Sequence, residues 1–131
     1  MLYLDSSAIV KLVRREPESP ALVEEVLGDP ERASSALAWT EVIRAARRSR
    51  TNVDRASAVL EGIGLIPVDD GILRGAAELA PASLRSLDAI HLATAISLGD
   101  DLTAVVAYDD RLIAAARRNG LSVRSPGRTI A

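Results

Sequence analysis

The chain has 131 residues, of which 48% are apolar, and this size and composition predict one globular domain, residues 1–131, around a single core. It carries no cysteine and one histidine, which excludes disulfides, thiolate metal sites and a zinc site built from several imidazoles. The formal net charge is −2, and no signal peptide or membrane-length apolar run occurs, so we expect a cytoplasmic protein without membrane contact.

Short apolar runs alternate along the chain with segments of helical spacing. The runs predicted as strands are residues 1–4, 32–37, 65–68, 103–108 and 121–125. The segments predicted as helices are residues 5–16, 17–29, 37–50, 53–64, 71–80, 86–99 and 110–120. This alternation is typical of an α/β fold, a parallel central sheet of four to five strands with helices on both faces. Residues 126–131 are predicted as a loose tail.

Four acidic residues fall where such a fold gathers its functional groups. Asp5 ends the first predicted strand and Asp109 ends the fourth, and open α/β sheets bind ligands outside the carboxyl ends of their strands. Glu41 and Asp88 lie near the starts of apolar helices, and they reach the same crevice if these helices run back from the same sheet edge. Because clustered carboxylates repel one another unless a cation compensates, we expect a site for Mg²⁺ or Mn²⁺.

Three of these acids also have ordinary structural alternatives. Asp5 can be a helix N-cap, and so can Asp109 or its neighbour Asp110. Glu41 can instead pair with Arg44, three residues along a solvated helix face.

Asp88 has the weakest structural alternative, an ion pair with Arg85. It shares a helix face with Leu92 and Ala95, so we expect it to be buried, where a lone carboxylate is costly unless it is paired or bound to metal. His91 follows three residues later and can orient Asp88, but a core histidine is favoured because a hard cation prefers oxygen ligands.

Four stretches together resemble the PIN-domain family, and within it the VapC-type toxins of bacterial toxin–antitoxin pairs. They are YLDSSAIVKL (3–12), WTEVIRA (39–45), SLDAIHLATA (86–95) and VAYDDRLIAAARRNGL (106–121), in the family's order. The resemblance implies an endoribonuclease that depends on Mg²⁺ or Mn²⁺ and is inhibited by a VapB-type antitoxin. It also implies that the catalytic and metal-binding residues are Asp5, Glu41, Asp88 and Asp109, here called the acidic quartet.

The chain departs from the family pattern at Ala107, where relatives often carry Thr or Ser two positions before the last aspartate. Asp110 can share or replace the role of Asp109 because it lies directly beside it. Ser7 matches a position that is often polar in the family, and we expect it to bond a metal-bound water.

Setting the acidic quartet aside leaves 16 basic residues against 14 of the 18 acidic ones, which suits an RNA substrate. Two groups of basic residues follow a quartet member along the chain, and each either contacts phosphate or forms a solvated helix face. They are Lys11, Arg14 and Arg15 after Asp5, and Arg44, Arg47, Arg48 and Arg50 after Glu41.

Small apolar helix residues also predict a homodimer. A haloacid dehalogenase-type phosphatase is disfavoured because Ser7 stands where it needs a second aspartate. The remaining alternative is a catalytically inactive α/β protein-binding module.

Overall fold

The computed structural model describes residues 1–128, and within them it shows a sheet in which every strand pairing is parallel. The strands are β1 (Leu2–Leu4), β2 (Arg32–Ser35), β3 (Gly64–Ile66), β4 (Ala104–Val106) and β5 (Val123–Arg124). Their order across the sheet is β3-β2-β1-β4-β5. Each strand overlaps a segment expected to form one, so the predicted parallel α/β fold is confirmed. The helix predicted over 53–64 is too long, however, because it ends at Glu61 and Gly64 begins β3.

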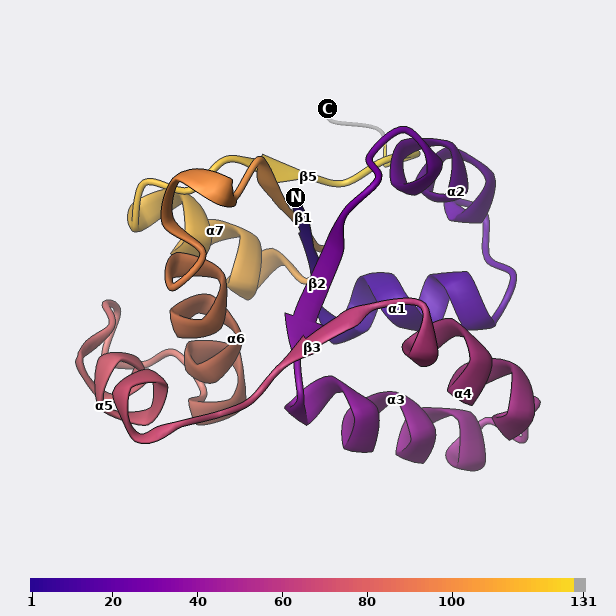
Figure 1. Cartoon of the computed structure of the whole chain (residues 1–131), viewed down its shortest axis with the longest axis horizontal. Helices are drawn as coiled ribbons and strands as arrows, with labels where there is room; N and C mark the ends of the chain where they lie inside the picture. Colours follow the sequence, from indigo (N-terminus) through magenta and orange to yellow (C-terminus); the bar gives the residue numbers. More distant parts are fainter. Residues whose placement is uncertain (129–131) are drawn as a thin grey trace.

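Helices cover both faces of this sheet. They are α1 (Ser6–Val13), α2 (Ser19–Leu27), α3 (Leu37–Arg48), α4 (Val53–Glu61), α5 (Asp70–Glu78), α6 (Ser86–Ile96) and α7 (Asp110–Arg118), with a short 3-10 helix, η1 (Gly99–Asp101). The first four helices lie on one side of the sheet and α5 to α7 lie on the other (Figure 1).

The central strands are buried on both faces because their side chains alternate in direction. Leu2 and Leu4 join the core beneath the first four helices, whereas Tyr3 joins the core beneath α6 and α7. In β4, Val106 faces the first core and Val105 faces the second. With Ala, Val, Leu and Ile filling both layers, helices of small residues pack closely against a short sheet.

The strand order creates a switch point at the centre of the sheet. The chain extends from β1 through β2 and β3 in one direction, then returns to place β4 and β5 on the other side of β1. Tyr3 is in register with Val105, and the backbone N–H of Asp5 donates to the carbonyl of Val106 at 3.1 Å. The carboxyl ends of β1 and β4 therefore lie side by side, where open α/β sheets bind ligands.

Two expectations about the ends of elements need correction. The helix predicted over 86–99 ends at Ile96, because Gly99 adopts a φ of 55° and begins η1. The predicted loose tail is wrong for residues 126–128, since the Tyr108 hydroxyl donates to the Pro126 carbonyl at 2.7 Å and Arg128 donates to the Tyr108 carbonyl at 3.1 Å. Residues 129–131 of that tail lie outside the described residues.

Within residues 1–128, no helix has the length and apolar character needed to cross a membrane.

Candidate active site

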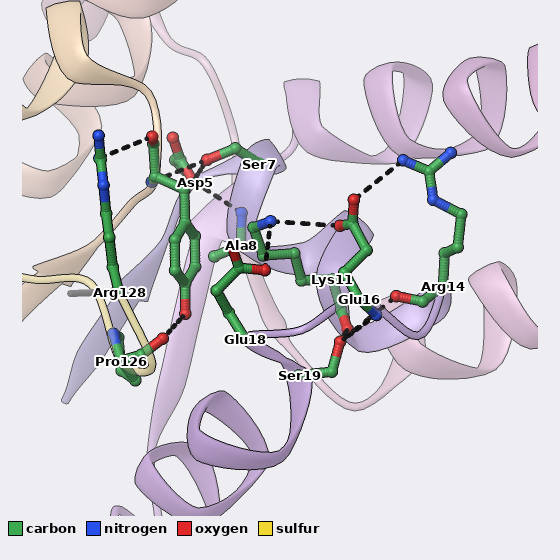
Figure 2. Close-up of polar contacts among 11 residues, drawn as sticks. Asp5, Ser7, Ala8, Lys11, Arg14, Glu16, Glu18, Ser19, Pro126 and Arg128 are labelled. Atoms are coloured by element: carbon green, nitrogen blue, oxygen red, sulfur yellow. Dashed lines mark hydrogen bonds and ion pairs between the residues drawn. The ribbon is translucent and has the colours of Figure 1, made fainter.

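Asp5 follows β1 directly, and the residue is only 3% exposed. Its Oδ1 caps α1 by accepting from the backbone N–H of Ala8 at 2.9 Å and from the Ser7 hydroxyl at 2.7 Å (Figure 2). Burial raises the pKa of this carboxyl to about 6; the bonds from Ser7 and Ala8 oppose the rise, and the charge of Asp109 adds to it. Asp5 is therefore an N-cap, but within residues 1–128 no donor reaches its Oδ2.

Asp109 caps α7 in the same way. Its Oδ1 accepts from the backbone N–H groups of Arg111 and Leu112, both at 3.0 Å. The neighbouring Asp110 is 80% exposed at its side chain and pairs with Arg128, at 2.5 Å from Oδ1 to Nη2. The two adjacent aspartates thus differ: Asp110 is engaged in a surface ion pair, whereas Asp109 keeps one oxygen free of protein donors in the described part of the chain.

Glu41 lies in the second turn of α3, and its partner is a histidine. Its Oε1 is 2.6 Å from Nε2 of His91 and accepts from the Ser6 hydroxyl at 2.6 Å. Burial acts to raise the pKa of Glu41, but the hydrogen bonds from His91 and Ser6 outweigh it and hold the pKa below its usual range. Among residues 1–128, Glu41 forms no ion pair with Arg44, and His91 makes no hydrogen bond to Asp88.

Asp88 lies in the first turn of α6 and is half-buried, so the expectation of an enclosed carboxylate is wrong. The helix is buried over residues 91–95 but opens to solvent at its start. Burial raises the pKa of Asp88, and the charges of Asp109 and Glu41 raise it further. Arg85 lowers this pKa through its charge, yet no ion pair between the two side chains occurs within the described residues.

Members of the acidic quartet lie close enough to the switch point to shift one another's pKa through charge. Asp109 raises the pKa of both Asp5 and Asp88, and Glu41 raises that of Asp88. Three helices begin beside these carboxylates: Asp5 caps α1, Asp109 caps α7, and Asp88 lies in the first turn of α6. Their N-terminal dipoles favour negative charge and partly offset the repulsion among the carboxylates.

The donor set fits a hard cation held partly by water. Within residues 1–128, no three acidic or histidine side chains already stand in the arrangement of a metal site. Yet Asp5, Glu41 and Asp109 each engage protein donors through one oxygen and leave the other without a protein donor in this part of the chain. Mg²⁺ takes one or two carboxylates and keeps several waters, so this open set of oxygens suits it.

Ser7 is predicted to bond a metal-bound water, but its contacts with protein groups and those of its neighbours have no signature in the sequence. The Ser7 hydroxyl donates to Asp5 and accepts from the backbone N–H of Tyr108 at 3.1 Å, so it ties the end of β1 to the end of β4. Ser6 and Tyr3 carry no signal beyond lying near Asp5. His91 contacts Glu41 rather than Asp88, and because this partner is 50 residues away, no local pattern reveals the pairing.

The first predicted basic group is largely engaged with acids of the same region. Lys11 lies 3.3 Å from a carboxylate oxygen of Glu16 and 3.1 Å from one of Glu18 (Figure 2). Its ammonium also lies 4.8 Å from the centre of the Tyr108 ring, and Arg14 pairs with Glu16 at 3.2 Å. Lys11 is therefore not free to contact phosphate.

The second basic group is different. Its side chains are exposed on the last turns of α3 and just after it, and none pairs with a carboxylate within residues 1–128: Arg44, Arg47, Arg48 and Arg50. A groove between α1 and α3 lies beside them, and its polar lining comes from Arg14, Arg48, Ser49 and Thr51. This surface offers guanidinium and hydroxyl groups to an anion.

Residues 2–118 match the family described as PIN domain. The chain is 48% identical over 126 residues to Ribonuclease VapC46 of Mycobacterium tuberculosis, covering 95% of this chain and 97% of the relative. A toxin-antitoxin complex from Klebsiella pneumoniae matches the fold with a TM-score of 0.74 at 21% identity, covering 99% of this chain and 100% of that one. Mycobacterium tuberculosis VapC20, described as a sarcin-ricin loop cleaving toxin, matches with a TM-score of 0.72 at 15% identity, covering 88% and 95%. At these identities the two solved structures show likeness of fold alone.

Proposed function

The chain belongs to the PIN-domain family and, within it, to the VapC group, and we propose that it is an endoribonuclease toxin of a type II toxin–antitoxin system. Its relative at 48% identity carries the name ribonuclease. The observation that carries the proposal is that Asp5 and Asp109 follow the adjacent strands β1 and β4, and that the charges of Asp109 and Glu41 raise the pKa of Asp88. Mg²⁺, with Mn²⁺ as a substitute, is the cofactor that this oxygen donor set suits.

The side chains of the quartet would hold the cation from fixed positions. Asp5 and Asp109 are N-caps, so backbone N–H groups set the place of each carboxylate while one oxygen remains free. Asp88 reaches the crevice from the first turn of α6, and Glu41 reaches it from α3. A bound Mg²⁺ supplies Lewis acidity, which lowers the pKa of water and stabilises the charge that develops on a phosphate.

The exposed arginines of α3 support RNA as the substrate. Guanidinium groups bind phosphate through paired donors, and Arg44, Arg47, Arg48 and Arg50 are exposed on the helix that also carries Glu41 or just after it. A strand of RNA whose backbone follows α3 would place one phosphate at the acidic quartet. Lys11 contributes little to this RNA-binding surface because it is paired with Glu16 and Glu18.

The proposed macromolecular partner is an antitoxin of VapB type. Support comes from the likeness to a solved toxin-antitoxin complex, whose chain is matched over its full length. Such a partner inhibits most directly by covering the crevice and presenting a cationic side chain to the quartet. A homodimer remains a prediction, for which the sequence offers only its small apolar helix residues.

The decisive experiment incubates the purified chain with a mixed RNA pool and either Mg²⁺ or Mn²⁺. Cleavage that stops with EDTA supports the proposal. Because a water molecule rather than the 2′-hydroxyl attacks, the new ends should carry 5′-phosphate and should be degraded by a 5′-phosphate-dependent exonuclease. RNA that stays intact with both metals, or cleavage that is insensitive to EDTA, contradicts it.

A further inference from the structure

The only histidine of the chain lies at the centre of a polar chain that links four elements around the acidic quartet. His91 of α6 is 2% exposed. Its Nδ1 is 2.7 Å from the hydroxyl of Tyr3 in β1, and its Nε2 is 2.6 Å from Oε1 of Glu41 in α3. The Ser6 hydroxyl, at the start of α1, donates to the same Oε1 at 2.6 Å.

The direction of each hydrogen bond follows from the groups present. The Glu41 carboxylate only accepts, so Nε2 of His91 must carry a proton and donate it. In the neutral ring Nδ1 is then an acceptor, and the Tyr3 hydroxyl is placed to donate to it. Glu41 therefore fixes the tautomer of His91, and the Tyr3 hydroxyl holds the opposite edge of the ring in place.

Both donors that reach Glu41 use the same oxygen. With Oε1 bonded to His91 and Ser6, the carboxylate cannot rotate without breaking two short hydrogen bonds, and Oε2 is left free of protein donors within residues 1–128. His91 also lies three residues after Asp88 on α6, so one helical turn carries a quartet member and the partner of another. Helix α6 therefore carries both Asp88 and the residue that bonds Glu41.

We propose that His91 is a positioning residue, which holds Glu41 by Oε1 so that Oε2 is the atom presented to the cation, and that Tyr3 fixes the ring for this task. The inference rests on the proposed function, because it assigns a role within that site. Partners that orient a metal ligand in this way typically change cation affinity by about 10- to 100-fold when they are removed.

Two substitutions of His91 by an amide side chain distinguish a positioning role from a role in core packing alone. The amide nitrogen of His91→Gln reaches the place of Nε2 and can donate to Glu41, whereas the shorter side chain of His91→Asn cannot. Both variants lose the ring, so thermal unfolding of the metal-free proteins should show similar losses of stability. Calorimetric titration with Mn²⁺ alone should show binding about 10-fold weaker for His91→Asn, and within about threefold of wild type for His91→Gln.

Equal affinities of His91→Asn and wild type would overturn the inference, and so would equal weakening of both variants. If the wild-type chain binds no Mn²⁺ and cleaves no RNA, both the proposed function and the role of His91 are refuted. If the wild-type chain does both and His91→Asn matches it, only the inference fails.

Nitrogen NMR gives a readout that needs neither metal nor RNA. Because the chain has one histidine, its imidazole yields a single pair of ring signals. The wild type should show a proton on Nε2, and Tyr3→Phe should keep it there, because the carboxylate of Glu41 still accepts from Nε2. Glu41→Gln, whose amide can donate or accept, should allow the proton to distribute between both nitrogens. A wild-type ring whose Nε2 carries no proton would overturn the assignment.

Discussion

Replacing Asp5 by asparagine removes a charge from the most buried carboxylate of the quartet and keeps its shape. Folding raises the pKa of this carboxyl from its ordinary 3.8 to about 6. At 1.36 kcal/mol per pKa unit, the ionised Asp5 destabilises the metal-free fold by about 3 kcal/mol. Asparagine is as good an N-cap as aspartate and can accept the bonds from Ser7 and Ala8. Metal-free Asp5→Asn should therefore be more stable than wild type at neutral pH, by about 1–3 kcal/mol.

The pH range of this effect follows from the two pKa values of Asp5. Below about pH 4 the carboxyl is protonated in both the folded and the unfolded chain, so wild type and variant should differ little. Between about pH 4 and pH 6 the folded chain holds the proton more tightly, so the stability of wild type relative to the variant falls as pH rises. Above about pH 6 the full difference is present.

The assay is urea unfolding of both proteins in EDTA at pH 4.5 and pH 7.5. Asp110→Asn serves as the matched control, because Asp110 is exposed and its side chain contacts only Arg128 as an ion pair within residues 1–128. Mg²⁺ should then stabilise wild type and not Asp5→Asn, since a ligand of the native state stabilises it. A variant that is less stable than wild type at pH 7.5, or a difference that does not change with pH, would refute the electrostatic reasoning.

Three further predictions concern the surroundings of the site. Ser7→Ala removes a bond that lowers the pKa of Asp5, so the pH at which Mg²⁺ begins to raise the melting temperature should move upward; an unchanged midpoint would contradict this. Expression of the chain alone should arrest growth, and Asp88→Asn or a co-expressed VapB-type antitoxin should relieve the arrest, as colony counts will show. The double variant Arg47→Ala, Arg48→Ala should weaken RNA binding. The slope of log affinity against log salt concentration should become shallower by about two phosphate contacts, and an unchanged slope would mean that the RNA binds elsewhere.

The fold was largely predictable because short apolar strands and amphipathic helices carry their periodicity in the sequence. The strands Leu2–Leu4 and Ala104–Val106 are continuous apolar runs because both faces of the sheet are covered. The sequence alone places Asp5 and Asp109 at one edge of the sheet, since parallel strands end on the same side. Asp5 caps α1 through Oδ1 and leaves Oδ2 for a cation. This division between the two carboxylate oxygens cannot be predicted from sequence patterns.

The pairing of His91 with Glu41 could not be predicted, since their side chains meet only through the packing of α6 against the centre of the sheet. The apolar character of residues 86–99 indicated burial of the whole helix, yet its first turn is open and Asp88 is half-buried. Amphipathic periodicity averages over a helix and does not report the exposure of one end.

We propose that the acidic quartet forms one cation site at which RNA is cleaved. The most direct test is the cleavage rate of one RNA at fixed Mg²⁺ by Asp5→Asn, Glu41→Gln, Asp88→Asn and Asp109→Asn, each beside the Asp110→Asn control. Each quartet variant should lose at least about 100-fold in rate, which corresponds to about 2.7 kcal/mol of transition-state stabilisation, while the control stays within about twofold of wild type. Quartet variants that keep wild-type rates, or a control that loses activity as they do, would contradict the account.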